Sequence, residues 1–360
     1  MWLINSSIGR KFVMAVTGVC LVLFVTFHVL MNSVAIFWPA AYNQVCEFLG
    51  ANWYALVASI GLAALFIIHI IYALWLTFQN RAARGVDRYA VNARQPQVEW
   101  SSKNMLVLGI VVVAFLVVHL IQFWAKMQLV ELRHAELDVL PQLNGTPVQP
   151  AMGTLFIEMA FKEIWTPIIY IIGFVALWFH MTHGFWSMFH TIGWDNNRWL
   201  GRLKCIANWW TTIVVGLFVI QAVVFTIQAR NDYYSKDPAL QAQYAESWAN
   251  VAQETMDEFN GDIASYMGEF QNADPSTMTM EQRMEMQQKA QAAQDKFIKE
   301  KGKDYAEKIE FIQKSMEAQC PNYQVALSPQ KLQTVAQLFQ MGATLTQMLN
   351  MPTGNQTQPQ

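Results

Sequence analysis

Five histidines of this 360-residue sequence lie inside long apolar segments, where a titratable side chain is unusual. Imidazole can carry a proton, bind a metal ion or make a hydrogen bond between two helices, and this last role is the ordinary one for any single histidine. Four successive apolar segments each contain at least one, which favours a shared function. The five are His28, His69, His119, His180 and His183.

The segments that carry these histidines are long enough to cross a membrane. The sequence is 54% hydrophobic and only 14% charged, which is unusual for a soluble protein. A spanning helix needs about 20 apolar residues. We therefore predict an all-α fold, an integral membrane bundle of five transmembrane helices near residues 12–38, 53–78, 104–126, 165–190 and 206–228.

Composition divides the chain into two parts. Residues 1–228 hold the apolar segments and form the predicted transmembrane domain that carries the histidines, whereas residues 229–360 are polar and rich in Gln and Met. The polar part is predicted to be a mainly helical extension outside the membrane, with helices near 238–270, 279–318 and 328–350. Its role is not indicated by its sequence.

The loops predict the orientation of the bundle. Ten of the 13 Lys and Arg residues in 1–228 lie before the first helix, between the second and third, or between the fourth and fifth. The positive-inside rule then places the N-terminus in the cytoplasm and the tail in the periplasm of a multi-pass protein of the bacterial inner membrane. Cys46 and Cys320 would both lie outside, and whether they form a disulfide stays open.

Depth along the helices sorts the histidines into pairs. At 1.5 Å per residue, His28 and His119 each lie roughly 21 to 24 Å from the cytoplasmic start of their helices. His69 and His180 lie roughly as far from the outer start of theirs, so they belong to the inner half. The result is an outer and an inner pair about 15 Å apart in depth.

Two matched pairs suit two b-type haems with two axial histidines each. An apolar pocket between helices can bury the porphyrin while facing helices supply the ligands. A zinc or copper site would require three or four ligands at one level. The residues alone leave open whether His180 or His183 is the fourth ligand, because the two share one helix face.

Glycines add a second regularity to the first and third helices. Gly18 precedes His28 by ten residues, and Gly109 precedes His119 by ten. A small residue here can let a flat ligand approach the backbone or can serve helix packing, and both readings stay open.

The histidine pattern, together with the stretches TGVCLVLFVTFHVLMNS and FHMTHGFWSMFHTIGW, resembles the dihaem cytochrome b anchor of succinate dehydrogenases and fumarate reductases. The resemblance covers about residues 1–228. It implies that His28 and His119 hold the outer haem and that His69 and His180 hold the inner one, since the family ligand in the fourth helix lies four residues before a glycine. The 229–360 extension departs from the family pattern.

The resemblance also implies the place of the chain in a larger enzyme. A flavoprotein subunit and an iron–sulfur subunit would dock on the cytoplasmic side, and the dicarboxylate active site would belong to them. This chain would then move electrons between the iron–sulfur subunit and a quinone, expected to be menaquinone, near the outer haem. We expect the lipid membrane as a further partner and no nucleic acid.

Further residues are candidates for supporting roles. Quinone chemistry needs a group that exchanges protons with water, and Glu47, just after the first helix, is the best-placed acid, with Tyr42 and Asn43 as its companions. Asn32 and Ser33, one turn beyond His28, are further candidates for lining this quinone pocket. Arg81 and Arg84 follow His69 closely enough to pair with haem propionates, although ordinary positive-inside charge explains them equally well. The histidine of His180 and His183 that is not a ligand could contact a propionate or a quinone.

Two other classes of protein remain as alternatives. One is the dihaem anchor of a different quinone-linked oxidoreductase, such as a nitrate reductase or formate dehydrogenase. The other is a transporter or receptor without haem, in which the histidines would serve transport or packing.

Overall fold

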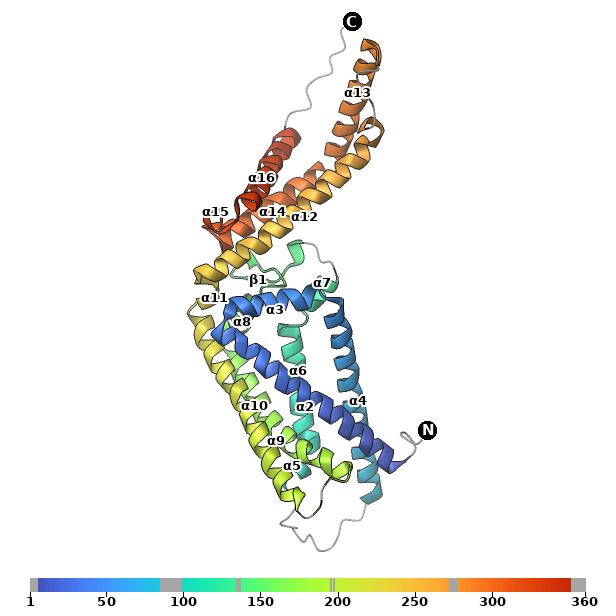
Figure 1. The fold of residues 1–360 in the computed structure, drawn as a ribbon, viewed down its shortest axis with the longest axis vertical. Coiled ribbons are helices and arrows are strands. Elements are labelled where there is room, and N and C mark those ends of the chain that lie inside the picture. The colour runs from blue at the N-terminus through green and yellow to red at the C-terminus, as the bar shows by residue number, and fades with distance from the viewer. Residues whose placement is uncertain are drawn as a thin grey trace. The chain divides into compact units, whose positions relative to one another are not determined.

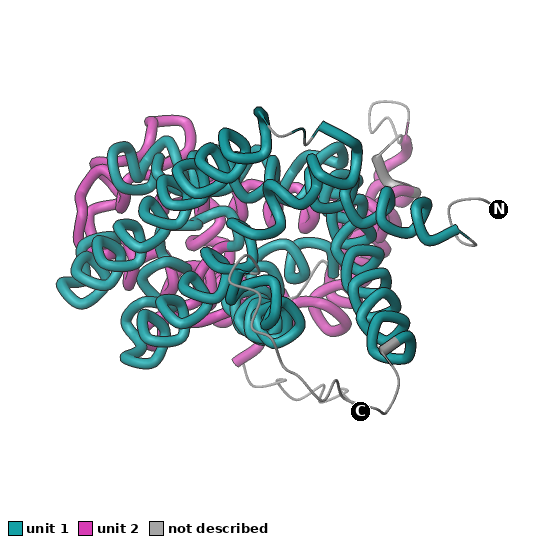
Figure 2. The backbone as a smooth tube through the Cα atoms, turned by 90° about the horizontal axis from the view of Figure 1, so that it is seen from below, with its two compact units in different colours: residues 1–134, 150–234 teal, residues 135–149, 235–360 magenta. Residues whose placement is uncertain are grey.

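The computed structural model describes residues 6–84, 99–133, 137–194, 196, 198–271 and 278–350. By its internal contacts the chain forms two units, coloured separately in Figure 2. Unit 1 comprises residues 1–134 and 150–234, and unit 2 comprises residues 135–149 and 235–360. The loop segment 135–149 therefore belongs with the polar tail, a grouping that the division of the sequence at residue 228 did not foresee.

Unit 1 is an all-α membrane bundle, and five of its helices are long and apolar enough to cross a membrane (Figure 1). The segments of these helices that could cross a membrane run over Ser7–Phe37, Trp53–Ala83, Met105–Gln122, Trp165–Thr191 and Trp199–Arg230. The number of helices predicted from hydropathy is thus confirmed. The corresponding elements are α2 (Ser7–Phe37), α4 (Trp53–Arg84), α6 (Met105–Gln122), α9 (Trp165–Thr191) and α10 (Trp199–Arg230).

The ends of these helices differ from the predicted ends where polar residues continue a helix. Helix α2 begins at Ser7, where the Ser6 hydroxyl caps it by accepting a hydrogen bond from the Gly9 N–H at 2.9 Å. Helices α4 and α10 likewise extend through the basic segments that hydropathy left outside them. We call the end of the bundle at which α2, α6 and α10 begin the basic end, after Arg10, Lys103, Arg202 and Lys204, and the other the opposite end.

Short helices outside the five spans were not predicted. Pro39 ends the first predicted span but is also the first residue of a new helix, a position that tolerates its missing N–H. Asn43 of that helix accepts hydrogen bonds from the backbone N–H and the hydroxyl of Thr154, both at 2.9 Å. The short helices of unit 1 are α3 (Pro39–Ala51), α5 (Trp100–Lys103), α7 (Gln128–Leu132) and α8 (Gly153–Lys162).

Helix α9 packs against α2, α6 and α10 and so lies at the centre of the bundle. Its contact with α6 is close, because Phe115 lies against the backbone of Gly173, where any side chain would collide with the phenyl ring. Tyr170 and Phe174 complete this cluster, with ring centres 5.0 and 5.5 Å from that of Phe115. The aromatic cluster fixes the spacing of α6 and α9 between the two levels at which histidines occur.

Unit 2 is also mainly helical. Its described residues include one short hairpin, in which the two-residue strand β1 (Gln142–Leu143) pairs antiparallel with the two-residue strand β2 (Thr146–Pro147). Its core includes the fully buried Trp248, whose indole N–H donates to Gln319 at 2.7 Å. The helix predicted near 279–318 is interrupted by one π-helical turn. The remaining elements are η1 (Leu137–Val139), α12 (Pro238–Gln271), α13 (Met280–Phe297), the π-helix η3 (Ile298–Gly302), α14 (Lys303–Gln319), α15 (Tyr323–Ala326) and α16 (Pro329–Asn350); α11 (Tyr233–Lys236) joins the two units along the chain.

Candidate functional site

The structure brings four histidines together as two facing pairs. The ring centres of His28 on α2 and His119 on α6 lie 5.8 Å apart, with the rings at 85° to each other. Those of His69 on α4 and His180 on α9 lie 6.4 Å apart at 63°. Two imidazoles that bind one metal ion from opposite sides, each at about 2 Å, have ring centres roughly 6 to 7 Å apart. Both pairs are therefore spaced close to what a shared ion requires.

The glycines show that the pairs lie at different levels of the bundle. A methyl group at Gly18 would lie 3.8 Å from Cε1 of His69, and one at Gly109 would lie 3.6 Å from Cε1 of His180. Each glycine thus faces a histidine of the pair nearer the basic end. His28 and His119 follow these glycines by ten residues, or about 15 Å of helix.

At the level nearer the basic end, a threonine fixes the orientation of one imidazole. The Thr17 hydroxyl donates to the Val13 carbonyl at 2.9 Å, so its oxygen is left to accept from Nδ1–H of His69 at 3.1 Å. This leaves Nε2 of His69 with a free lone pair, as in metal-binding histidines whose other nitrogen is held by a neighbour. Across from it, Nδ1 of His180 is buried and has no hydrogen-bond partner among the described residues. A buried polar nitrogen without a partner is unfavourable unless something absent from the protein chain contacts it.

At the other level a tyrosine has the same role. The Tyr170 hydroxyl donates to Oε1 of Gln122 at 2.9 Å, and its oxygen accepts from Nδ1–H of His119 at 3.2 Å. Gln122 is held in turn by Thr166, to which its amide donates at 2.9 Å. Nε2 of His119 is therefore free to bind a ligand.

His28 is connected to the opposite end of the bundle by polar side chains. Its Nε2 lies 3.0 Å from the amide nitrogen of Asn32, whose oxygen accepts from the Tyr42 hydroxyl at 3.2 Å. Tyr42 contacts the thiol of Cys46, and burial raises the pKa of Cys46 to about 12 and that of Tyr42 well above its ordinary value. Both groups are therefore neutral at physiological pH, so they continue the hydrogen-bonded chain from His28 without carrying charge.

No protein-family model, curated protein or solved structure matches this chain. In the part of the chain that the structure describes, no group of three or more His, Cys, Asp or Glu residues could hold a metal ion. The two histidine pairs are therefore the arrangement on which a function can be argued.

His183 does not take part in either pair. Its Nδ1 lies 3.4 Å from Oε2 of Glu99, the oxygen that also accepts from the Trp186 indole at 3.3 Å. Lys204 reaches the other carboxylate oxygen at 2.9 Å. Burial would raise the pKa of Glu99, but the hydrogen bonds from Lys204, His183 and Trp186 outweigh it and hold the pKa below its usual value. Between His180 and His183, the structure thus places His180 opposite His69 and ties His183 to the basic end.

The remaining candidates are less close to the histidines. Glu47 is exposed, and Ser33 accepts from the buried Gln221 amide at 2.9 Å rather than facing His28. Arg81 is exposed near the end of α4. The side chain of Arg84 lies outside the described residues, and His190 is exposed in the last turn of α9.

Glu131 is an acidic residue that the sequence did not single out. It lies on α7, and its carboxylate sits against Gly50 of α3, where a methyl group would collide with it. Burial raises the pKa of this carboxyl group above its usual value, and its charge raises the pKa of Cys46 on the same face of α3. Its burial depends on α3, a helix that was not predicted from the sequence.

Proposed function

We propose that this chain is a dihaem cytochrome b that anchors a succinate dehydrogenase or fumarate reductase in the membrane and links its iron–sulfur subunit to a quinone. The observation that supports this most strongly is the presence of two facing histidine pairs at two levels of one membrane bundle. A transporter or receptor gives no reason for two such pairs. Bound haem would supply reversible one-electron chemistry at each level.

The residues present fit the binding of haem iron. His69 and His119 are held by hydroxyl groups with Nε2 free, and the buried Nδ1 of His180 has no hydrogen-bond partner among the described residues. His28 differs, because the amide of Asn32 is already close to its Nε2 and would give way on ligation. His69 and His180 would hold the haem nearer the basic end, and His28 and His119 the other.

The opposite end of the bundle suits the exchange of protons with a quinone. Asn32 and Tyr42 lead from His28 towards Cys46 of α3. The half-buried carboxylate of Glu131, on α7, packs against the face of α3 that carries Cys46. The raised pKa of Glu131 brings it nearer to neutral pH, where a carboxyl group can both take up and release a proton. Glu131 therefore replaces Glu47 as our proposed proton carrier, and menaquinone remains the expected quinone.

The basic end would face the cytoplasm and the flavoprotein and iron–sulfur subunits. The positive charges of Arg10, Lys103, Arg202 and Lys204 support this orientation through the positive-inside rule. The dicarboxylate active site would lie on the partner subunits, so the chain is part of an enzyme without carrying its substrate site. The inner membrane and a periplasmic unit 2 follow from the same orientation.

A spectrum tests the haem assignment. The purified protein, reduced with dithionite and compared with its oxidised form, should show b-type absorption bands and two haems per chain; a chain without those bands would be the transporter or receptor instead. Co-purification of a flavoprotein and an iron–sulfur protein, with quinone reduction by succinate or quinol oxidation by fumarate, selects this complex. Activity with formate or nitrate would assign the anchor to another oxidoreductase.

A further inference from the structure

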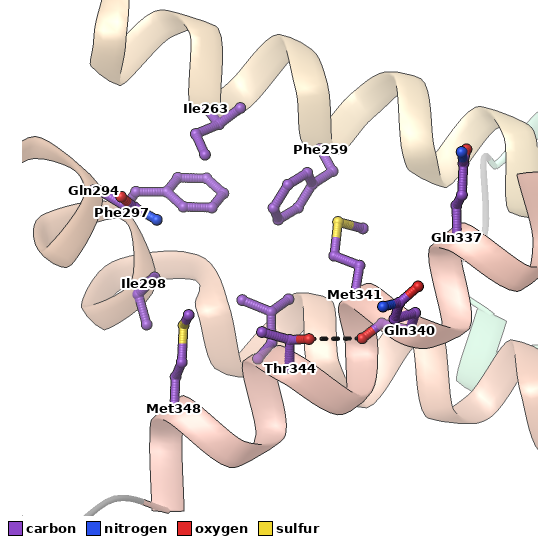
Figure 3. Close-up of a pocket in the computed structure, with 11 residues that line it drawn as sticks. Phe259, Ile263, Gln294, Phe297, Ile298, Gln337, Gln340, Met341, Thr344 and Met348 are labelled. Atoms are coloured by element: carbon purple, nitrogen blue, oxygen red, sulfur yellow. Dashed lines mark hydrogen bonds between the residues drawn. The ribbon is translucent and has the colours of Figure 1, made fainter. Parts of the chain in front are cut away.

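Unit 2 contains a pocket that has no part in the proposed electron transfer. It has a volume of about 410 Å³ and lies between α12, the junction of α13 and η3, and α16 (Figure 3). Its apolar lining includes Phe259, Ile263, Phe297, Ile298, Met341 and Met348. Sites that bind small organic molecules are typically of this size and have a largely apolar lining.

The lining carries no charged side chain among the described residues. Its polar groups are the hydroxyl of Thr344 and three glutamine amides. Thr344 donates to the backbone carbonyl of Gln340 at 2.9 Å, which leaves its oxygen as an acceptor. A charged ligand would lose its hydration without gaining a counter-ion, whereas a neutral molecule with one oxygen could use these amides.

The π-helix η3 shapes one wall of this pocket. Ile298, its first residue, lines the pocket, while the following residues hold η3 to α12 on another side. Glu300 accepts from the Tyr266 hydroxyl at 2.7 Å, and Lys301 forms an ion pair with Asp262 at 2.5 Å. Single π-helical turns are rare and occur frequently at functional sites. The hydrogen bond and the ion pair hold this π-helical turn against α12.

Helix α16 is firmly placed on its other face, so the pocket does not arise from loose packing. Gly342 lies so close to α14 that a methyl group there would be 2.5 Å from Cγ2 of Ile309. Val335 and Leu338 of α16, which do not line the pocket, are buried. The helix thus contacts α14 closely while its Met341 and Thr344 side chains face a space left open.

We propose that this pocket binds a neutral, lipid-like molecule, whose hydrocarbon part contacts the phenylalanine and methionine side chains and whose single oxygen-containing group meets the glutamine amides. The aromatic and methionine side chains offer polarisable contacts that adapt to a flexible chain. Filling the space restores the dispersion contacts that the apolar lining otherwise lacks. The site is independent of the haem assignment.

Photocrosslinking on the full-length protein tests this site. The probe is a long-chain alcohol with a diazirine in its chain, and the labelled peptides are mapped by mass spectrometry. Labelling should concentrate on residues 259–263, 294–298 and 337–348. The transmembrane helices, which meet the probe in any membrane, give the background in the same sample.

Two threonines of α16 provide a matched pair of variants. Thr344→Trp places an indole in the pocket, whereas Thr346→Trp alters another exposed threonine whose hydroxyl also donates to a carbonyl four residues earlier. The first should reduce labelling of unit 2 at least fivefold, and the second should leave it unchanged. Circular dichroism of both variants shows that the helices have formed.

Two results would overturn the proposal. One is labelling of unit 2 that is no stronger than the transmembrane background or that survives Thr344→Trp. The other is equal labelling by the matching long-chain carboxylic acid, because a charged group has no counter-ion in this lining.

Discussion

The two histidine pairs have similar spacing but different surroundings. Near the basic end, one imidazole is held by Thr17 and the other has a buried nitrogen with no hydrogen-bond partner in the part of the chain that the structure describes. At the other level, both imidazoles are engaged, one by Tyr170 and one by Asn32, and the latter continues through Tyr42 to the end of the bundle. Similar pairs are thus embedded in an apolar setting in one case and a hydrogen-bonded network in the other. Under the proposed function, the level near the basic end would carry electrons alone, and the other would couple electron transfer to protons.

Substitution of a histidine proposed to bind haem should have the largest effect. His180→Leu and His28→Leu should each remove about one of the two haems, because each pair would lose an imidazole and leucine cannot bind iron. The haem content of the purified variants, measured as the pyridine haemochrome, decides the outcome. His183→Gln is the control and should retain both haems, since His183 contacts Glu99 and not His69. Retention of both haems in His180→Leu would refute the pairing.

Loss of a supporting hydroxyl should have a smaller effect, confined to one level. Thr17→Val removes the partner of His69 and Tyr170→Phe that of His119, and loss of such partners typically weakens metal binding about 10- to 100-fold. Haem titration of the apoprotein should show weaker binding of one haem in each variant. Thr77→Val, which removes a hydroxyl that donates within α4 to Ala73, should change neither.

Proton exchange should depend on Glu131 and not on Glu47. Glu131→Gln should lower quinone turnover by about an order of magnitude and remove a pH dependence from its rate, because the amide cannot carry the proton. Glu47→Gln is the matched control, since that carboxylate is exposed on the same helix as Tyr42. Equal rates in the two variants would contradict the assigned path, while unchanged haem spectra would show that the haem sites are intact.

The ion pair at the basic end should give the smallest effect. The folded pKa of Glu99 is lowered from 4.5, so its charge stabilises the fold above that pH and the stabilisation is lost as the pH falls through the lower folded value. Between pH 6 and pH 3.5, Tm of the wild type should fall more than that of Glu99→Gln, by an amount worth less than about 1 kcal/mol because the group is partly exposed. The exposed Glu163→Gln should behave as the wild type does. If Tm of Glu99→Gln fell as much as that of the wild type, the ion pair would be excluded as the cause of the pH dependence.

Helical rise and hydropathy predicted the five spanning helices, and they also suggested which histidines share a level. Both follow from distances along a helix, which a sequence contains. The supporting hydroxyls of Thr17 and Tyr170 were not predicted, because each acts on a histidine 52 or 51 residues away across a helix interface. Glu131 was missed for a related reason, since its burial depends on α3, a helix that begins at the proline taken to end the first span.

The absence of a side chain at Gly173 links the two levels mechanically. Phe115 meets the backbone of α9 at this point, between Tyr170, which holds the imidazole of His119, and His180 further along. A residue with a side chain at position 173 would push α6 and α9 apart and change the spacing on both sides of the contact together. The two levels can thus differ in their polar neighbours, but their geometries cannot be adjusted independently at this contact.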